Sequence, residues 1–118
     1  MSKPLGPYTP VVRAGDLLVT SGQLGMLDGK LVEGGIVAET RQTMANIRTL
    51  LEAEGASLSD VIKTTVFLAD IDDWATMNDP YLEALGDHRP ARTAFAVGGL
   101  PFGAKVEIEA WAYRPASS

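Results

Sequence analysis

The chain has 118 residues, of which 46% are hydrophobic and 21% are charged, with a formal net charge of −5 and no cysteine. This composition is typical of a single folded domain over residues 1–118, and it excludes a disordered chain, disulfides, thiolate metal sites and a cysteine nucleophile. No basic run and no apolar stretch of membrane-spanning length occurs, so nucleic acid and membranes are poor partner candidates. The first residues lack the apolar core of a signal peptide, and we expect a cytoplasmic location.

Short strands are predicted in the first third of the chain. Residues 11–13 and 17–21 are mostly apolar or β-branched, and Ala14-Gly15-Asp16 between them forms a turn. Asp28-Gly29 lies between apolar residues, a pattern that favours a tight hairpin turn.

A helix is predicted over residues 36–54. Its apolar stripe recurs at spacings of three and four residues, through Val37, Thr40, Met44, Ile47, Leu50 and Leu51. Gly55 is well placed to end it in a left-handed conformation.

The next segment combines a strand with interrupted helical turns. Residues 61–68 are rich in β-branched side chains and predict a strand. Asp72 or Asp73 is expected to cap a turn over residues 74–78. Asp79 and Pro80 then predict a fresh helix start, which Gly86 ends.

Two strands close the chain, over residues 91–97 and 105–113. The second alternates, with Val106, Ile108, Ala110 and Ala112 on one face. The first is small or apolar on both faces except for Arg92, so we expect cover on both sides, the second from another subunit. The order of elements predicts an α+β fold with two helices on one face of a mixed or antiparallel sheet.

Few residues are candidates for metal binding or nucleophilic catalysis. His88 is the only histidine and is more readily interpreted as a surface residue than as a ligand. Asp70, Asp72 and Asp73 lack the spacing of a calcium loop, and helix capping explains them better. Ser21 has no recognisable base partner, so a hydrogen-bonding role is the better interpretation.

Arg92 on one closing strand and two carboxylates on the other, Glu107 and Glu109, leave two alternatives open. A cross-strand ion pair with Tyr8 packed over it is the first, and spacing alone favours it. An anion-binding site with an acid or base beside it is the second, because a guanidinium cannot lose its charge to escape burial.

The sequence resembles the RidA/YjgF family of reactive-intermediate deaminases from Gly6 to about Tyr113. The pieces that carry the resemblance follow the family's order: Gly6-Pro7-Tyr8-Thr9, Ser21-Gly22-Gln23, Gly35-Ile36 with Thr40-Arg41-Gln42 and Asn46-Ile47, residues 60–68, Met77-Asn78 with Tyr81, Pro90-Ala91-Arg92-Thr93, and Leu100-Pro101 with residues 106–110. Each piece alone is weak, but together and in order they are specific.

The resemblance implies a chorismate-mutase-like homotrimer whose sheets form a central β-barrel, with three clefts between subunits. It implies hydrolysis of 2-imino or 2-enamino acids to 2-keto acids and ammonium, a protection against metabolite damage that needs no cofactor and no metal. A non-catalytic trimer that binds a 2-keto acid in the same cleft is the alternative. Ribonuclease activity fits an acidic chain with one histidine poorly, and a chaperone-like holdase would need exposed apolar patches.

The resemblance also assigns site residues. By the family's motif, Arg92 anchors the substrate carboxylate and Glu107 lies near the attacking water. Tyr8, Ser21 and Asn78 would line the pocket, and Gly22 would let the backbone approach the ligand. Two departures matter: Ala94 stands where many members have a cysteine, and the segment from Tyr81 to Pro90 is shorter than in common members. Because that loop lies near the cleft by resemblance, we expect a different substrate range.

Overall fold

The computed structural model describes residues 6–116, and most of the N-terminal segment to which the signal-peptide expectation refers lies outside the described residues. The elements in chain order are β1 (Val11–Ala14), β2 (Leu17–Thr20), β3 (Met26–Leu27), β4 (Lys30–Leu31), α1 (Gly35–Ala53), η1 (Leu58–Asp60), β5 (Val61–Leu68), η2 (Ile71–Asp73), α2 (Trp74–Leu85), β6 (Ala91–Ala96), η3 (Pro101–Gly103) and β7 (Val106–Tyr113).

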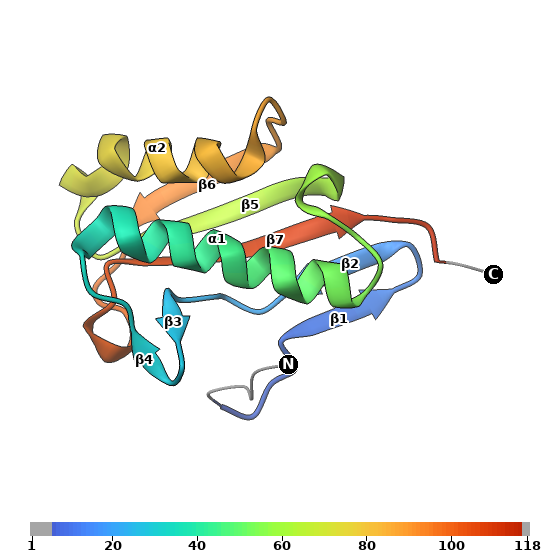
Figure 1. Ribbon diagram of the computed structural model, residues 1–118, viewed down its shortest axis with the longest axis horizontal. Coiled ribbons are helices and arrows are strands. Elements are labelled where there is room, and N and C mark those ends of the chain that lie inside the picture. The colour runs from blue at the N-terminus through green and yellow to red at the C-terminus, as the bar shows by residue number, and fades with distance from the viewer. Residues whose placement is uncertain (1–5, 117–118) are drawn as a thin grey trace.

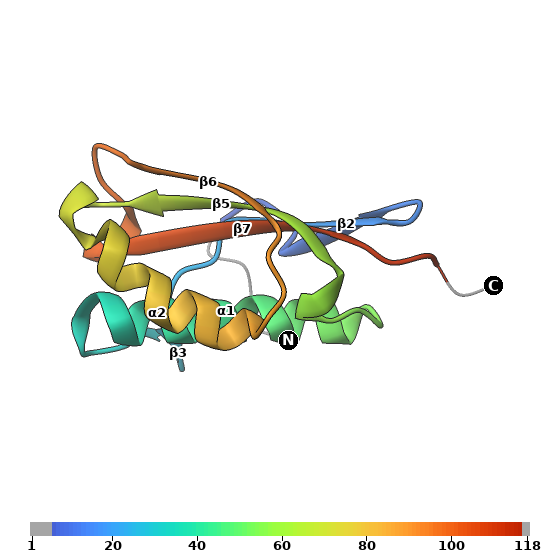
Figure 2. The ribbon, with the colours of Figure 1, turned by 90° about the horizontal axis from the view of Figure 1, so that it is seen from above.

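One five-stranded sheet in the order β1-β2-β7-β5-β6 forms the main layer. All its pairings are antiparallel except β5 with β6, so the sheet is mixed. Figures 1 and 2 show α1 and α2 side by side on one face of this sheet. The predicted α+β plan with two helices on one face is therefore confirmed.

The core lies between the sheet and the helices. The predicted inner face of β7, consisting of Val106, Ile108, Ala110 and Ala112, is fully buried. These side chains pack in one cluster with Met44, Ile47 and Leu51 of α1 and Met77 and Leu85 of α2. Among residues 6–116, no helix covers the other face of the sheet, which we call the outer face.

The two closing strands are not neighbours, contrary to the arrangement that the ion-pair interpretation required. β5 lies between β6 and β7, which leaves β6 as an edge strand. The chain itself leaves the outer face of β6 open, with Phe95 42% exposed, so cover from another subunit stays a prediction. The strand preference of a segment does not say which strand it pairs with, and β6 instead joins β5 in a parallel ladder.

Helix α1 lies within one residue of its predicted bounds. Gly55 has a φ of 79°, and the amides of Gly55 and Ala56 donate to the carbonyls of Glu52 and Leu51. This arrangement is the hydrogen-bonded helix end that glycine favours. Helix α1 also buries a carboxylate, Glu39, that the apolar pattern did not reveal. Its Oε1 accepts a hydrogen bond of 2.7 Å from the Lys105 amide.

Helix α2 is continuous, so the predicted restart at Asp79 and Pro80 is wrong. Pro80 lies inside the helix and is buried. It removes one backbone donor, but burial of this face against the core stabilises the uninterrupted helix. Asp73 is the N-cap residue of α2, as predicted, but its side chain makes no capping hydrogen bond. Asp70 instead accepts from the Asp72 amide at 2.9 Å and caps the preceding η2 turn.

The predicted hairpin turn at Asp28-Gly29 is confirmed. Both residues have positive φ, 53° and 80°, and they connect β3 to β4 directly. A two-residue turn of this kind matches the twist of the two strands.

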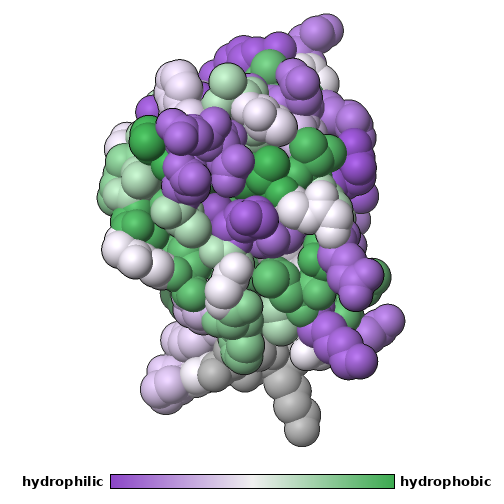
Figure 3. All heavy atoms as spheres, turned by 90° about the vertical axis from the view of Figure 1, so that its left-hand side faces the viewer, coloured by the Kyte–Doolittle hydropathy of each residue, from purple (hydrophilic) through white to green (hydrophobic). Residues whose placement is uncertain are grey.

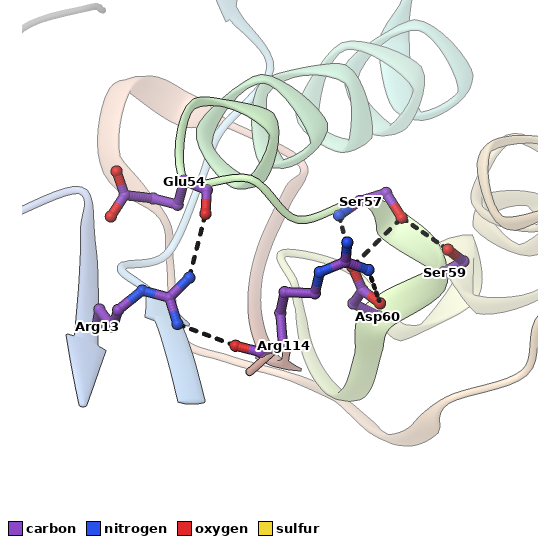
Figure 4. Close-up of polar contacts among 6 residues, drawn as sticks. All are labelled: Arg13, Glu54, Ser57, Ser59, Asp60 and Arg114. Atoms are coloured by element: carbon purple, nitrogen blue, oxygen red, sulfur yellow. Dashed lines mark hydrogen bonds and ion pairs between the residues drawn. The ribbon is translucent and has the colours of Figure 1, made fainter. Parts of the chain in front are cut away.

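A polar cluster holds the end of the sheet to the end of α1. Arg13 on β1 donates to the carbonyls of Glu54 at 3.1 Å and Arg114 at 3.0 Å, as Figure 4 shows. Arg114 in turn lies 3.8 Å from Asp60, whose carboxylate accepts from the Ser57 amide at 2.9 Å. One guanidinium therefore connects three segments that are distant in sequence.

The opposite end of the molecule, where α1 begins, has hydrophobic and hydrophilic side chains intermixed on its surface (Figure 3). Phe102, in the η3 turn between β6 and β7, is 64% exposed. Within residues 6–116, neither α1 nor α2 combines the length and apolar character that crossing a bilayer would require.

Candidate functional site

Arg92 lies on the helix-facing side of β6, in contact with α2. Its Nη1 donates to Asn78 Oδ1 at 2.7 Å. Its guanidinium carbon lies 5.0 Å from the ring centroid of Tyr81 and 5.4 Å from that of Trp74. Cation–π contacts of this kind stabilise a guanidinium without neutralising its charge. The structure thus brings together two predicted site residues, Arg92 and Asn78.

The sheet determines the position of the Tyr81 ring. Thr64 on β5 is the register partner of Arg92, and its hydroxyl is 2.6 Å from the Tyr81 hydroxyl. Both hydroxyls are buried, so this hydrogen bond fixes α2 against the sheet beside the backbone of Arg92. The guanidinium is held by a helix and a sheet that are themselves connected.

A cavity of about 230 Å³ adjoins this arginine, between the C-terminal half of α2 and the start of β6. Its lining consists of Asn78, Tyr81, Leu82, Arg89, Pro90 and Arg92, which we call the arginine pocket. Two of the six are arginines, and neither makes an ion pair among residues 6–116, where Arg41 pairs with Glu83 and Arg114 with Asp60. Two cationic side chains therefore border one cavity whose lining surface is mainly apolar.

Glu107 lies on the outer face of the sheet, beside the segment that follows β2. Gln23 and Ile108 exchange backbone hydrogen bonds of 2.8 and 3.0 Å, which holds Gly22 next to Glu107. A Cβ atom at position 22 would lie 2.8 Å from Glu107 Cδ, so any residue other than glycine would displace the Glu107 carboxylate. Burial raises the pKa of Glu107 above its ordinary value, and the charge of Glu109 adds to the effect.

Ser21 connects this region to the N-terminal segment. Its hydroxyl donates to the Thr9 carbonyl at 2.7 Å, and its amide donates to the Pro10 carbonyl at 2.8 Å. Tyr8 lies in the same entry segment and is 43% exposed. We call Ser21, Gly22 and Glu107 the glutamate group; Ser21 has the hydrogen-bonding role that its sequence context indicated.

The arginine pocket and the glutamate group lie on opposite faces of one sheet. Phe67 is the register partner of both Phe95 and Glu107, and its ring meets that of Phe95 edge-on at 5.4 Å. Arg92 precedes Phe95 by three positions, so its side chain points to the other face. The predicted ion pair of Arg92 with Glu107 or Glu109 is therefore wrong.

His88, the candidate histidine ligand, has another partner. The His88 ring donates from Nε2 to the Val61 carbonyl at 2.6 Å, and the ring is partly buried rather than on the surface. In the described part of the chain, no group of three or more histidine, aspartate or glutamate side chains is arranged to hold a metal.

Sequence reasoning missed Trp74 and Arg89 and gave Tyr81 no role. Trp74, Asn78 and Tyr81 are spaced by four and three residues, which places all three on one face of a helix. The predicted break at Pro80 hid this pattern. Arg89 carries no comparable signal, because its place in the pocket depends on the turn at residues 86–90.

A family model described as "Endoribonuclease L-PSP" matches residues 1–114. A RutC family protein of Pyrococcus horikoshii is 46% identical over 114 residues, covering 95% of this chain and 90% of that protein. A 2-iminobutanoate/2-iminopropanoate deaminase of Bos taurus is 44% identical over 112 residues, covering 93% and 82% of the two chains. The crystal structure of the YjgF gene product from E. coli superposes with a TM-score of 0.89 at 38% identity, covering 94% and 91%.

Proposed function

The chain belongs to the endoribonuclease L-PSP (RidA/YjgF) family, and we propose that it hydrolyses 2-imino or 2-enamino acids to 2-keto acids and ammonium. The observation that carries the proposal is Arg92, a half-buried guanidinium that Asn78 and two aromatic rings hold beside a cavity without a carboxylate partner among the described residues. A planar pair of donors suits the carboxylate that every such substrate carries.

A second copy of the chain completes the proposed site. Arg92 and Glu107 point to opposite faces of one sheet, so a cleft that uses both takes each from a different chain. The outer face also exposes large apolar side chains, among them Val12, Phe95, Trp111 and Tyr113. Head-to-tail contacts between such surfaces close into a ring. We propose a homotrimer in which the outer faces form a central β-barrel and three clefts lie between subunits.

In the proposed reaction, Arg92 holds the substrate carboxylate and so fixes the imine carbon. A water molecule attacks that carbon of the protonated imine, its oxygen forms the new C–O bond while the C=N π electrons move to nitrogen, and Glu107 accepts a proton from the water. The resulting carbinolamine receives a proton on nitrogen, the C–N bond breaks, and the nitrogen leaves as ammonia while the hydroxyl loses its proton to become the ketone. Ammonia takes up one further proton to give ammonium.

The proposed reaction requires little from the protein beyond positioning the substrate and one water molecule. An imine is already electrophilic, so fixing the carboxylate and one water supplies much of the catalysis, and the proposal needs no cofactor. A carboxylate whose pKa is raised accepts a proton more readily. Burial and Glu109 raise the pKa of Glu107 in this direction.

The description of the family model names an endoribonuclease, and the charges of this chain argue against that activity here. The net charge is −5, and the single histidine donates its ring hydrogen to a backbone carbonyl. RNA binding depends on basic surface that neutralises phosphates.

A non-catalytic trimer that binds 2-keto acids is the second candidate, since the arginine pocket is complete within one chain.

A competition assay tests the proposal. An amino-acid oxidase generates the imine in situ, semicarbazide competes for it, and keto-acid release is followed with the wild type, Arg92→Ala and Arg48→Ala. Arg48 is an exposed α1 residue with the same charge and serves as the matched control.

We expect the wild type and Arg48→Ala to accelerate keto-acid release. In Arg92→Ala this acceleration should fall roughly 100-fold or more, because the substitution removes paired charge-assisted hydrogen bonds to the substrate carboxylate. No acceleration by a folded wild type that still binds 2-keto acids would favour the non-catalytic candidate. Full activity of Arg92→Ala would exclude the anchor role.

A further inference from the structure

The arginine pocket contains a second cation that the proposed reaction does not use. A 2-imino acid with an apolar side chain has one carboxylate, and Arg92 is assigned to it. Arg89 lines the same cavity of about 230 Å³. With roughly 30 Å³ of liquid volume per water molecule, this cavity has room for a small polar side chain beyond the anchor.

Arg89 is held in place through one nitrogen only. Its Nη1 donates to the carbonyls of Gly86 at 2.6 Å and His88 at 3.0 Å. Its Nε and Nη2 make no hydrogen bond to the described residues. Arg92 likewise uses Nη1 alone, toward Asn78. Each guanidinium is thus fixed by one nitrogen and keeps further donors for an anion.

The acidic side chains near the pocket do not neutralise these arginines. Glu83 on α2 pairs with Arg41 at 3.2 Å. Asp79 and Asp87 are exposed and make no ion pair with either arginine. Arg89 is exposed and Arg92 is half-buried, and two arginines without an ion pair beside one cavity favour a ligand with more than one negative charge.

The spacing of the two arginines suits such a ligand. The two arginines are three positions apart, so their Cα atoms lie at most about 10 Å apart, and Pro90 between them restricts the backbone. We propose that Arg89 binds a second, side-chain carboxylate of the substrate, which makes 2-imino dicarboxylic acids, the imines of aspartate and glutamate, the preferred substrates. This inference rests on the proposed function of the same site.

Substrate comparison across variants tests the inference. Oxidases generate the imines of aspartate, glutamate and alanine, and kcat/KM is measured for the wild type, Arg89→Ala, Arg89→Gln and the control Arg48→Ala. We expect a wild-type preference for the two dicarboxylic imines. Both Arg89 variants should lower the ratio of dicarboxylic to alanine-derived kcat/KM roughly 10- to 100-fold, the range for hydrogen bonds between charged groups.

Equal changes for all three imines, or a ratio that falls as much in Arg48→Ala, would overturn the inference while leaving the deaminase proposal intact. Arg89→Gln keeps a long polar side chain and guards against a misfolded alanine variant. Circular dichroism and the melting temperature check the fold of each variant.

A binding measurement separates this inference from the proposed function. If the wild type turns over no imine, the deaminase proposal fails, and titration calorimetry with 2-oxoglutarate and 2-oxobutanoate then decides the inference alone. Tighter binding of 2-oxoglutarate that is lost selectively in Arg89→Gln supports the second carboxylate site. Equal affinity for the two keto acids overturns it.

Discussion

Arg92 and Glu107 extend from opposite faces of the same five-stranded sheet. The helix-facing guanidinium contacts Asn78 and the rings of Trp74 and Tyr81, whereas the carboxylate adjoins Gly22 on the outer face. β5 also separates the two strands. A site that uses both residues therefore requires two chains, and this requirement can be tested directly.

Mixed assembly of two inactive variants should restore activity. Arg92→Ala and Glu107→Gln each remove one half of the proposed site, so each alone should be inactive. If the halves come from different subunits, random mixed trimers restore about one quarter of the sites, because a site needs an intact arginine and an intact neighbour. Co-refolding the two variants and assaying keto-acid release measures the recovery.

Mixing each variant with itself is the control for that experiment. Recovery that stays at the background of the single variants would mean that both residues act within one chain or that one of them has no role.

Glu107 should titrate above the ordinary glutamate range, and Glu109 should contribute to the shift. Burial is the larger cause and the Glu109 charge the smaller, so Glu109→Gln should lower the pKa of Glu107 without restoring its ordinary value. Carboxyl ¹³C chemical shifts measured against pH give both values. The acid limb of kcat/KM should move in the same direction, because protonated Glu107 cannot accept a proton.

The same shift predicts a pH dependence of stability. With the pKa raised in the folded state, the native chain binds more protons than the unfolded chain between the two pKa values, so the free energy of unfolding falls as pH rises through that window. Glu107→Gln removes the contribution of this carboxylate to the pH dependence of the free energy of unfolding. Urea unfolding of both proteins should show the variant gaining stability over the wild type near pH 7 relative to pH 4. A constant difference between them would contradict the raised pKa.

Gly22→Ala should reduce activity more than stability. A Cβ atom there would overlap the Glu107 side chain rather than backbone, and a flexible side chain can move away. The carboxylate is then displaced from its proposed position at a small cost in folding free energy. Steady-state kinetics and thermal melts separate the two effects.

Gly99→Ala is the matched control, because a Cβ atom at Gly99 meets nothing within 4 Å. Similar kinetics for the two alanine variants would show that the close approach at Gly22 has no functional consequence.

Arg13→Ala should destabilise the fold by about 1–2 kcal/mol, since the charged guanidinium donates to three backbone carbonyls. Without the Arg13 guanidinium, no hydrogen bond from this position connects the end of α1 to the edge of the sheet, as the contacts in Figure 4 indicate. Chemical denaturation measures it, with Arg48→Ala as the reference. A destabilisation no larger than that of Arg48→Ala would assign the contacts in Figure 4 no net contribution.

Local patterns in the sequence determined much of the fold. The alternation in β7, the stripe on α1 and the Asp28-Gly29 turn were predicted because each depends on backbone preferences and on burial of one face. The resemblance placed Arg92 and Asn78 in one site, and the structure holds them 2.7 Å apart. Such signals are readable because they act over a few residues.

Only the tertiary structure decided how these parts face one another. Pro80 stays inside α2 because burial against the core outweighs one missing hydrogen bond, a balance that the chain order does not reveal. β5 enters between β6 and β7 because strand pairing is chosen by the whole sheet and not by the strands themselves. That insertion separates Arg92 from Glu107, whereas the turn at residues 86–90 places Arg89 at the same cavity as Arg92.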